Sequence, residues 1–218
     1  MPVREIVEGW PVLLVIDIQK SDFLDERAGV ADGIPVMDGY RDRVIRTREL
    51  VDVAHETGVP IVFFKEIHRP DHVDFGRELD GSEGVHCIET SPLTEVADEM
   101  DMRATDYCIG KRRYSCFFGT DLEILLKGLK AETLVLTGGL TDVCVHYTFV
   151  EGHQRNYFVR VVEDCVAGSS LRAHEGALEA MEYLQTGARR SLAEMIAAFR
   201  LHGPRHANTQ KDTKTAVG

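Results

Sequence analysis

The sequence predicts an α/β protein: a single doubly wound, three-layer domain in which a mostly parallel sheet of about six strands carries helices on both faces. Apolar, β-branched runs alternate along the chain with stretches of helical periodicity. A length of 218 residues is enough for one well-buried core and short for two ordinary domains. Neither an internal repeat nor a linker interrupts this alternation. We therefore expect parallel strands joined by right-handed crossovers.

The first predicted strand covers residues 12–19, which are nearly all apolar, as in a central strand that is covered on both faces. Asp17 is an acidic residue near its end. The alternative is that Asp17 is a cap or turn residue. Because Ile18 still has strand character, we expect the carboxylate to lie at the carboxyl edge of the sheet, where open α/β sheets bind ligands.

The next elements follow in order. Residues 21–35 predict a loop, 38–57 a helix that ends at the Gly-Val-Pro of 58–60, and 61–67 the second strand. The long polar stretch 68–92 predicts a wall or lid of a site. A short helix is expected over 93–102, and residues 107–111 predict a strand that ends at Lys111.

The second half of the chain continues the pattern. Thr-Asp-Leu-Glu at 120–123 has the form of a capping box and predicts a helix start. Residues 134–137 and 157–164 predict strands, and Ser169-Ser170 opens a helix whose apolar face carries His174, expected as a core or interface residue. A short strand and helix end near residue 202. We expect the folded domain to span 1–202 and residues 203–218 to be a disordered tail.

Composition excludes several classes of function. The net charge of −11, with basic clusters only at 111–113 and 189–190, argues against a nucleic-acid partner. Five cysteines without C-x-x-C spacing fit neither a disulfide framework nor a zinc motif. We expect no secretory leader, because no basic segment precedes an apolar stretch at the start of the sequence. No apolar run approaches the roughly 20 residues that span a membrane, and no G-x-G-x-x-G or P-loop motif occurs. We expect a cytoplasmic protein without a membrane partner.

The apolar run 134–137 leads into Gly138-Gly139, then Thr141-Asp142, then Cys144, about where a helix would begin. Such glycines permit backbone conformations that side chains forbid. Thr141 or Asp142 is a candidate cap, and a helix N-terminus stabilises a thiolate. The alternative is that Cys144 is a small buried apolar residue.

Asp17, Lys111 and Cys144 all lie at or just beyond predicted strand ends, which a parallel sheet brings to one edge. A thiolate is a nucleophile, an ammonium favours its ionisation, and a carboxylate can accept the thiol proton and pass it to a leaving amine. Backbone N–H groups of 139–144 are candidates for an oxyanion hole. The alternative for Lys111 is a solvated member of the basic run at 111–113.

Three motifs together resemble the isochorismatase-like cysteine hydrolase superfamily, which includes nicotinamidases and N-carbamoylsarcosine amidohydrolases. They are residues 14–19 with 22–23, residues 111–115 with 118–122, and residues 138–145, and the resemblance runs from 12 to 187. It implies a catalytic triad of Asp17, Lys111 and Cys144. It also implies a cis peptide between Gly139 and Leu140, with the Leu140 and Cys144 amides turned toward the oxyanion.

The resemblance extends to a metal site. Nicotinamidases carry a metal on an Asp-x-His pair after the second strand and on a later histidine, where this chain has Glu66-Ile67-His68 and His86. Glu66 in place of aspartate departs from that pattern. Carboxylate and imidazole ligands suit zinc, manganese or iron. The alternative is that His68, His72 and His86 are polar loop residues or contact the substrate directly.

The resemblance favours a cysteine amidohydrolase that cleaves a C–N bond of a small amide, carbamoyl or ureido compound through a thioester, with no cofactor needed for the cysteine chemistry. Phe23, Arg113, His146 and Tyr147 are expected in the pocket wall, since they lie close to triad positions in the sequence. A homo-oligomer, dimer or tetramer, is expected. The alternatives are an isochorismatase-type vinyl ether hydrolase and an inert oligomeric binding protein.

Overall fold

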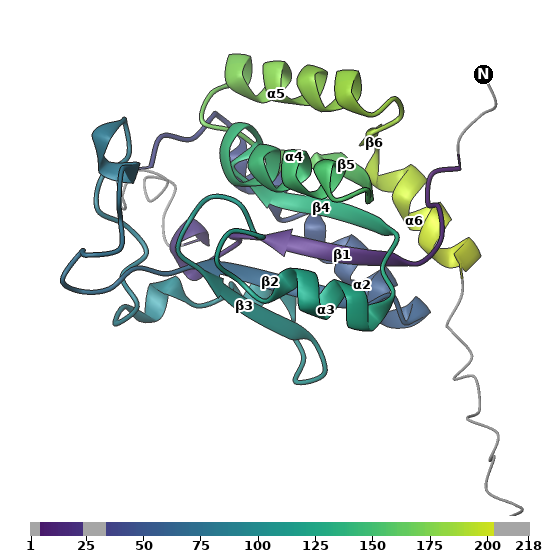
Figure 1. Ribbon diagram of the computed structural model, residues 1–218, viewed down its shortest axis with the longest axis horizontal. Helices are drawn as coiled ribbons and strands as arrows, with labels where there is room; N and C mark the ends of the chain where they lie inside the picture. Colours follow the sequence, from purple (N-terminus) through teal and green to yellow (C-terminus); the bar gives the residue numbers. More distant parts are fainter. Residues whose placement is uncertain (1–4, 24–33, 203–218) are drawn as a thin grey trace, which may run out of the picture.

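The structure is a computed structural model that describes residues 5–23 and 34–202. Within them, six strands form one sheet in the order β3-β2-β1-β4-β5-β6, and every neighbouring pair is parallel (Figure 1). The strands are β1 (Pro11–Ile16), β2 (Ile61–Glu66), β3 (Tyr107–Lys111), β4 (Thr133–Gly139), β5 (Phe158–Ala167) and β6 (Arg189–Arg190). The helices are α1 (Tyr40–Val44), α2 (Thr47–Thr57), α3 (Leu122–Leu129), α4 (His146–Gln154), α5 (Leu171–Leu184) and α6 (Leu192–His202). The predicted α/β class is confirmed.

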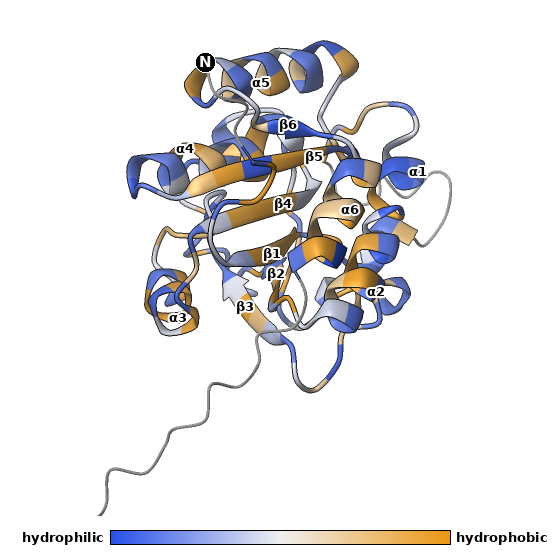
Figure 2. Cartoon of the chain, turned by 90° about the vertical axis from the view of Figure 1, so that its right-hand side faces the viewer, coloured by the Kyte–Doolittle hydropathy of each residue, from blue (hydrophilic) through white to orange (hydrophobic). Residues whose placement is uncertain are grey.

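Helices cover both faces of the sheet. One core joins α1, α2 and α6 to side chains such as Leu13 and Val15 of β1, and the other joins α3, α4 and α5 to Val12 and Leu14 (Figure 2). All six residues of β1 are buried, because alternate side chains enter opposite cores. This explains why β1 is continuously apolar instead of alternating with polar residues.

The helix predicted over 38–57 is two helices, α1 and α2. At their junction the Arg46 N–H donates to the Arg43 carbonyl, and the Arg48 N–H donates to Ile45, each at 3.1 Å. This spacing of three residues is that of a tighter 3₁₀ turn, which interrupts the α-helical ladder.

The helix predicted over 93–102 is absent from the described chain, so this prediction is wrong. Two single 3₁₀ turns, Pro92–Thr94 and Asp98–Met100, take its place. Between them Val96 forms a bridge with Gln19, and the Ala97 N–H donates to Ile18 at 3.0 Å. The backbone is used for extended pairing and is not available to a helix.

Other boundaries differ by a few residues. β1 stops at Ile16, three residues before the predicted end, whereas β4 and β5 run beyond theirs. α3 begins at Leu122 as predicted, but without a reciprocal capping box: the Thr120 hydroxyl accepts from the Leu122 N–H at 3.3 Å, while Glu123 pairs with Lys127. Ser170 caps α5 as expected, accepting from the Ala173 N–H at 3.2 Å. The tail predicted at 203–218 lies outside the described residues.

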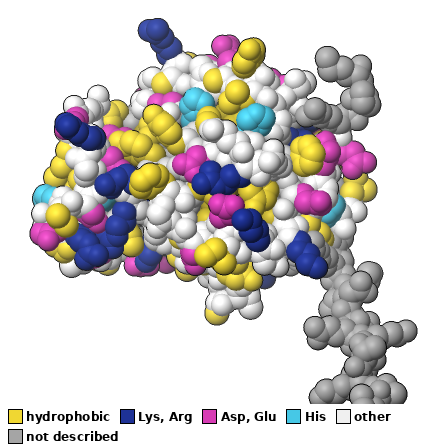
Figure 3. Space-filling view, in the orientation of Figure 1, with side chains coloured by type: hydrophobic (Ala, Val, Ile, Leu, Met, Phe, Trp, Pro, Cys, Tyr) yellow, Lys and Arg dark blue, Asp and Glu magenta, His cyan; other side chains and the backbone are white. Residues whose placement is uncertain are grey.

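The strand order reverses between the neighbouring strands β1 and β4, because the chain crosses to the other side of β1 after β3. β2 and β3 extend the sheet on one side of β1, and β4, β5 and β6 extend it on the other. Open α/β sheets bind ligands at the carboxyl ends of the strands beside this switch point. In the space-filling view, Lys and Arg side chains are interspersed with Asp and Glu over the exposed face (Figure 3). Among the described residues, no helix combines the length and apolarity needed to cross a bilayer.

Candidate active site

Four neighbouring strands deliver polar side chains to the switch point. Glu66 and Lys111 are the last residues of β2 and β3, and Asp17 directly follows β1. Cys144 lies in the turn after β4. Residues that are far apart in the sequence therefore meet at one edge of the sheet, because parallel strands all end there.

Lys111 is the centre of this group and is completely buried. Its Nζ lies 2.8 Å from Asp17 Oδ2, 3.3 Å from Glu66 Oε2 and 3.4 Å from Cys144 Sγ. Burial lowers the pKa of Lys111, but the two carboxylates and the thiol outweigh it and hold the pKa well above its usual value. Lys111 is therefore a fixed ammonium, and the alternative of a solvated lysine is wrong.

Asp17 has a left-handed backbone, with φ of 51°, which ends β1 and turns the side chain into the site. Apart from the ion pair with Lys111, neither of its carboxylate oxygens has a hydrogen-bond partner among the described residues. Burial raises the pKa of Asp17 to about 6, against the opposing charge of Lys111. The carboxylate is therefore ionised at neutral pH and available to accept a proton.

Cys144 is held in a π-helical turn, Thr141–Val145, that precedes α4. Gly138 has a φ of 106°, and a Cβ there would collide with the carbonyl oxygen of Ile16. The Gly139–Leu140 peptide is cis. The predicted cap is wrong for the described turn, since neither candidate side chain caps it.

The two cap candidates contact α5 and the residue just before its N-cap instead. Asp142 accepts hydrogen bonds from the N–H and hydroxyl of Ser169 at 2.8 and 2.6 Å. The Thr141 hydroxyl lies 2.8 Å from Nδ1 of His174, which is buried as expected. The turn that carries Cys144 is therefore tied to α5 by side chains, not by a helix cap.

Burial raises the pKa of the Cys144 thiol well above its usual value, although the charge of Lys111 acts in the opposite direction. The resting residue is thus a thiol. Its sulfur lies 3.9 Å from Glu66 Oε2. The residue Cys144 as a whole is 4% exposed. Cys144 is both buried and accessible from a recess, so the two alternatives for this cysteine are not exclusive.

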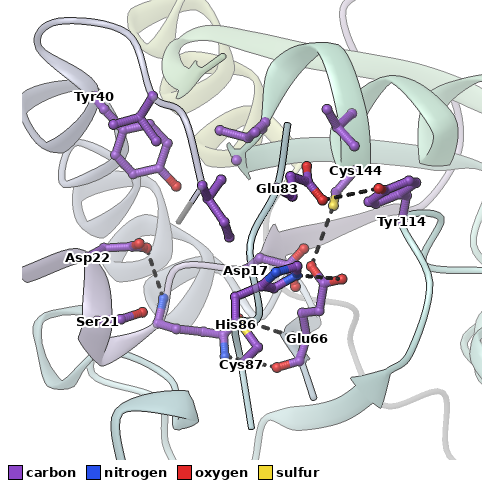
Figure 4. Close-up of a pocket in the computed structure, with 16 residues that line it drawn as sticks. Asp17, Ser21, Asp22, Tyr40, Glu66, Glu83, His86, Cys87, Tyr114 and Cys144 are labelled. Atoms are coloured by element: carbon purple, nitrogen blue, oxygen red, sulfur yellow. Dashed lines mark hydrogen bonds and ion pairs between the residues drawn. The ribbon is translucent and has the colours of Figure 1, made fainter. Parts of the chain in front are cut away.

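Cys144 borders a recess that opens to solvent (Figure 4). Its volume is about 720 Å³ when the open solvent at its mouth is included. Asp17 and Cys144, two of the three residues expected to form a triad, line it. Further described residues around it are Gln19, Ser21, Asp22, Ile34, Val36, Tyr40, Glu66, Glu83, His86, Cys87, Tyr114, Gly139, Leu140 and Val143.

The four residues expected in the wall are not among the lining residues. The ring of Phe23 lies under the Arg41 guanidinium at 5.2 Å, and Arg113 donates to the carbonyl of Asp74. Tyr147 is 54% exposed and stacks on Tyr114, which does line the recess. Residue His146 contacts the ring of Tyr147.

The lining residues that sequence reasoning missed are Tyr40, Glu83 and Tyr114 above all. Tyr114 lies three residues after Lys111, and this spacing was an available signal. Tyr40 opens α1, and its ring lies where a Cβ on Gly139 would be, so only the three-dimensional packing places it. Glu83 belongs to the 68–92 loop, which forms one wall through Glu83, His86 and Cys87.

A second group of polar side chains adjoins Asp17, Lys111 and Cys144. Glu66, His68 and His86, the candidate metal ligands, come together, and Glu78 joins them as a fourth residue that the sequence reasoning missed. The His68 Nε2 atom lies 3.3 Å from Glu66 Oε1 and 3.2 Å from Glu78 Oε2. The His86 Nε2 atom lies 3.7 Å from the same Glu66 oxygen. His72, the third histidine of the loop, is outside this group.

The donor set fits a divalent metal. All four residues are buried, and one ligand atom from each lies within 4.8 Å of the others. Apart from ion pairs with His68 and Arg113, neither oxygen of Glu78 has a hydrogen-bond partner among the described residues. Two carboxylates and two imidazoles are ligands that zinc, manganese and iron accept. Without a metal, burial lowers the pKa of His68, but the adjacent carboxylates of Glu66 and Glu78 outweigh it and raise the pKa to about 9.

Comparison with known proteins identifies the family. The model of the isochorismatase domain matches residues 11–194. A ureidoacrylate amidohydrolase of Methylorubrum extorquens is 30% identical over 197 residues, covering 78% of this chain and 75% of the relative. The N-carbamoylsarcosine amidase of Thermoplasma acidophilum is similar in structure, with a TM-score of 0.66 and 26% identity, over 84% of this chain and 95% of the other.

A pyrazinamidase of Pyrococcus horikoshii, whose structure is a complex with zinc, superimposes with a TM-score of 0.70 and 25% identity over 84% of this chain and 99% of the other. The isochorismatase family model covers most of the chain, and the residues that it matches include all six strands of the sheet. The chain belongs to the isochorismatase-like cysteine hydrolase superfamily.

Proposed function

We propose that this protein is a cysteine amidohydrolase that cleaves a non-peptide C–N bond of a small amide, carbamoyl or ureido compound. One observation carries the proposal: Lys111 Nζ is within 2.8 Å of the Asp17 carboxylate and 3.4 Å of the Cys144 sulfur, at the base of a recess. The names of the relatives, ureidoacrylate amidohydrolase and N-carbamoylsarcosine amidase, support the same bond type.

In the first half-reaction Cys144 attacks the substrate carbonyl. The thiol is neutral at rest because burial raises its pKa, so it must lose its proton as the S–C bond forms. Asp17 accepts this proton, and the ammonium of Lys111 stabilises the charge that develops on sulfur. The carbonyl electron pair moves to oxygen, where the backbone amides of Leu140 and Cys144 are proposed to stabilise it.

The tetrahedral intermediate then collapses. Asp17 returns its proton to the nitrogen, the C–N bond breaks, and ammonia or an amine leaves while the acyl group stays on Cys144 as a thioester. In the second half-reaction Asp17 removes a proton from water, which attacks the thioester carbonyl. The S–C bond breaks, sulfur regains a proton, and the acid product departs.

Glu66, His68, Glu78 and His86 are proposed to hold a divalent metal beside this centre. When bound, zinc, manganese or iron would act as a Lewis acid toward a polar or ring-nitrogen group of the substrate. Glu66 serves both groups, since its Oε1 faces the imidazoles and its Oε2 faces Lys111 at 3.3 Å. It therefore positions the ammonium on which the cysteine chemistry depends.

Ammonia release from a panel of small amides, carbamoyl compounds and ureas tests the proposal. We expect Cys144→Ala to abolish release from any substrate of the wild type and to lose alkylation at this position. Cys108→Ala is the matched control, because Cys108 is an exposed free thiol of β3, away from the recess. Circular dichroism would check that both variants fold. Turnover by a folded Cys144→Ala protein would refute the mechanism.

A further inference from the structure

Glu83 is a carboxylate on the wall of the recess that the proposed reaction does not use (Figure 4). Its Oε2 accepts a hydrogen bond from the Tyr114 hydroxyl at 3.0 Å. No lysine or arginine of the described residues pairs with it, in contrast to Glu89, which pairs with Arg112 at 2.9 Å. The charge of Glu83 therefore faces the recess with a neutral partner only.

The cations near the recess are balanced by other carboxylates: Lys111 by Asp17, and a divalent ion in the metal group would be balanced by Glu66 and Glu78. Asp17 and Glu66 face Lys111, which is buried beneath the recess and does not line it. The imidazole of His86 is directed to Glu66 through Nε2 and lies 2.7 Å from a backbone carbonyl through Nδ1. Asp22 adds a further lining carboxylate, which accepts from the Gln19 N–H at 3.1 Å.

An anionic group on a ligand would thus enter a recess whose described lining holds four carboxylates and no lysine or arginine. Like charges at close range in a partly buried site repel strongly, because the effective dielectric constant is well below that of water. A neutral amide, a hydroxyl or an ammonium can instead donate a hydrogen bond to Glu83. Burial already raises the pKa of Glu83, with Glu66 and Glu78 adding to this and Tyr114 opposing it, so a cationic partner would be favourable there.

We propose that Glu83 selects the substrate by charge: the amide or urea that this enzyme hydrolyses is neutral or cationic, and substrates that carry a carboxylate are rejected. The inference rests on the proposed function for the identity of the scissile bond. It separates this chain from the relatives named for ureidoacrylate, whose substrate is a carboxylate. Glu83 acts here as a specificity-determining residue.

Substrate series that differ only in distal charge test the proposal. One set is propylurea, 2-aminoethylurea and 3-ureidopropionate, and a second is butyramide, β-alaninamide and succinamate. We expect the wild type to show a kcat/KM at least about tenfold lower for the anion than for the neutral member. Glu83→Gln should remove most of this difference, a change of about 1.4 kcal/mol for each factor of ten. Glu99→Gln, at an exposed position outside the recess, is the control of equal charge.

A second measurement does not depend on turnover. Iodoacetamide and iodoacetate alkylate thiols alike but differ in charge, so their relative rates at Cys144, followed by mass spectrometry, report the field in the recess. We expect Glu83→Gln to raise the iodoacetate rate several-fold relative to iodoacetamide, and Glu99→Gln to leave the ratio unchanged.

The outcomes are distinguishable. If no amide or urea is hydrolysed, the proposed function fails, and the alkylation ratio still decides the charge proposal. An anionic substrate turned over as well as its neutral partner, or a ratio that Glu83→Gln does not alter, would overturn the charge proposal alone. Failure of both reagents to reach Cys144 would overturn it as well, since the recess would then not admit small ligands.

Discussion

Replacing Asp17 by asparagine is expected to abolish catalysis and to stabilise the fold. Burial raises the pKa of Asp17 from 3.8 to about 6, despite the neighbouring Lys111. A carboxyl group whose pKa is higher in the folded than in the unfolded protein binds its proton more tightly when folded. Its ionisation therefore lowers stability as the pH rises from about 4 to about 6, and the loss stays constant above that range. A shift of about two pKa units corresponds to about 3 kcal/mol.

Asparagine resembles the protonated aspartic acid in shape and charge, so Asp17→Asn should recover much of this free energy at pH 8. For a chain of this size, 3 kcal/mol corresponds to a rise in Tm of about 6–12 °C. The advantage should vanish near pH 4, where the wild-type carboxyl is itself protonated. Turnover should fall by at least about 10²-fold, because the proton acceptor is gone.

Thermal unfolding of both proteins between pH 4 and pH 8 measures this difference. Asp98→Asn is the matched control, since Asp98 is largely exposed and its ion pair with Lys20 should contribute less than about 1 kcal/mol. An Asp17→Asn protein that is less stable than the wild type at pH 8 would refute the reasoning. It would show that the attraction of Lys111 outweighs the burial of the carboxylate.

Three further predictions concern pH, metal and backbone. The kcat/KM for an uncharged amide should rise through an apparent pKa of about 6, because protonated Asp17 cannot accept the thiol proton; a flat profile from pH 5 to 7 would contradict this. Purified protein should contain zinc, manganese or iron by elemental analysis, and Glu78→Gln should weaken its retention against EDTA at least about tenfold; equal retention would exclude Glu78 as a ligand. Gly138→Ala should lower the free energy of unfolding, measured by urea denaturation, by several kcal/mol, since its Cβ would collide with Ile16. Gly128→Ala on α3 meets open space and should be neutral or slightly stabilising. Similar free energies of unfolding for the two variants would be evidence against the close approach.

The fold and the meeting of Asp17, Lys111 and Cys144 could be predicted because both depend on local patterns. Each of the three lies at or just beyond the end of a predicted strand. Parallel strands bring such ends to one edge of the sheet, independently of the loop conformations. The buried state of Lys111 could not be predicted in the same way. It depends on Glu66 from the neighbouring strand, whose charge adds to that of Asp17 in compensating the burial.

The rest of the site depends on packing over long distances. Glu78 reaches His68 because the 68–92 loop folds back: His68 pairs with Ile88, and the ring of Phe75 stacks on the imidazole at 3.9 Å. No periodic pattern in a polar loop encodes such a return. Glu83 is placed by the same loop, so the residue that we propose to select substrates could not be found from motifs.

The expected wall residue Tyr147 shows why nearness in sequence to a catalytic residue is a poor guide to the pocket. Three residues usually bring a side chain back to nearly the same face of an α-helix. The turn at Thr141–Val145 is π-helical, however, and its wider winding shifts the register between Cys144 and α4. Tyr147 is therefore half exposed, and it contributes by stacking on Tyr114, which takes the place in the wall.

The contacts of Glu66 explain why this chain has glutamate where the nicotinamidase pattern has aspartate. One carboxylate oxygen lies 3.3 Å from His68 Nε2, and the other lies 3.3 Å from Lys111 Nζ and 3.9 Å from the Cys144 sulfur. A residue at the end of β2 that serves both groups must reach past the strand end in two directions at once. The additional methylene of glutamate supplies this reach. The metal group and the cysteine centre therefore share one residue. A substitution in either group is expected to alter the position of Glu66 and hence the geometry of the other group.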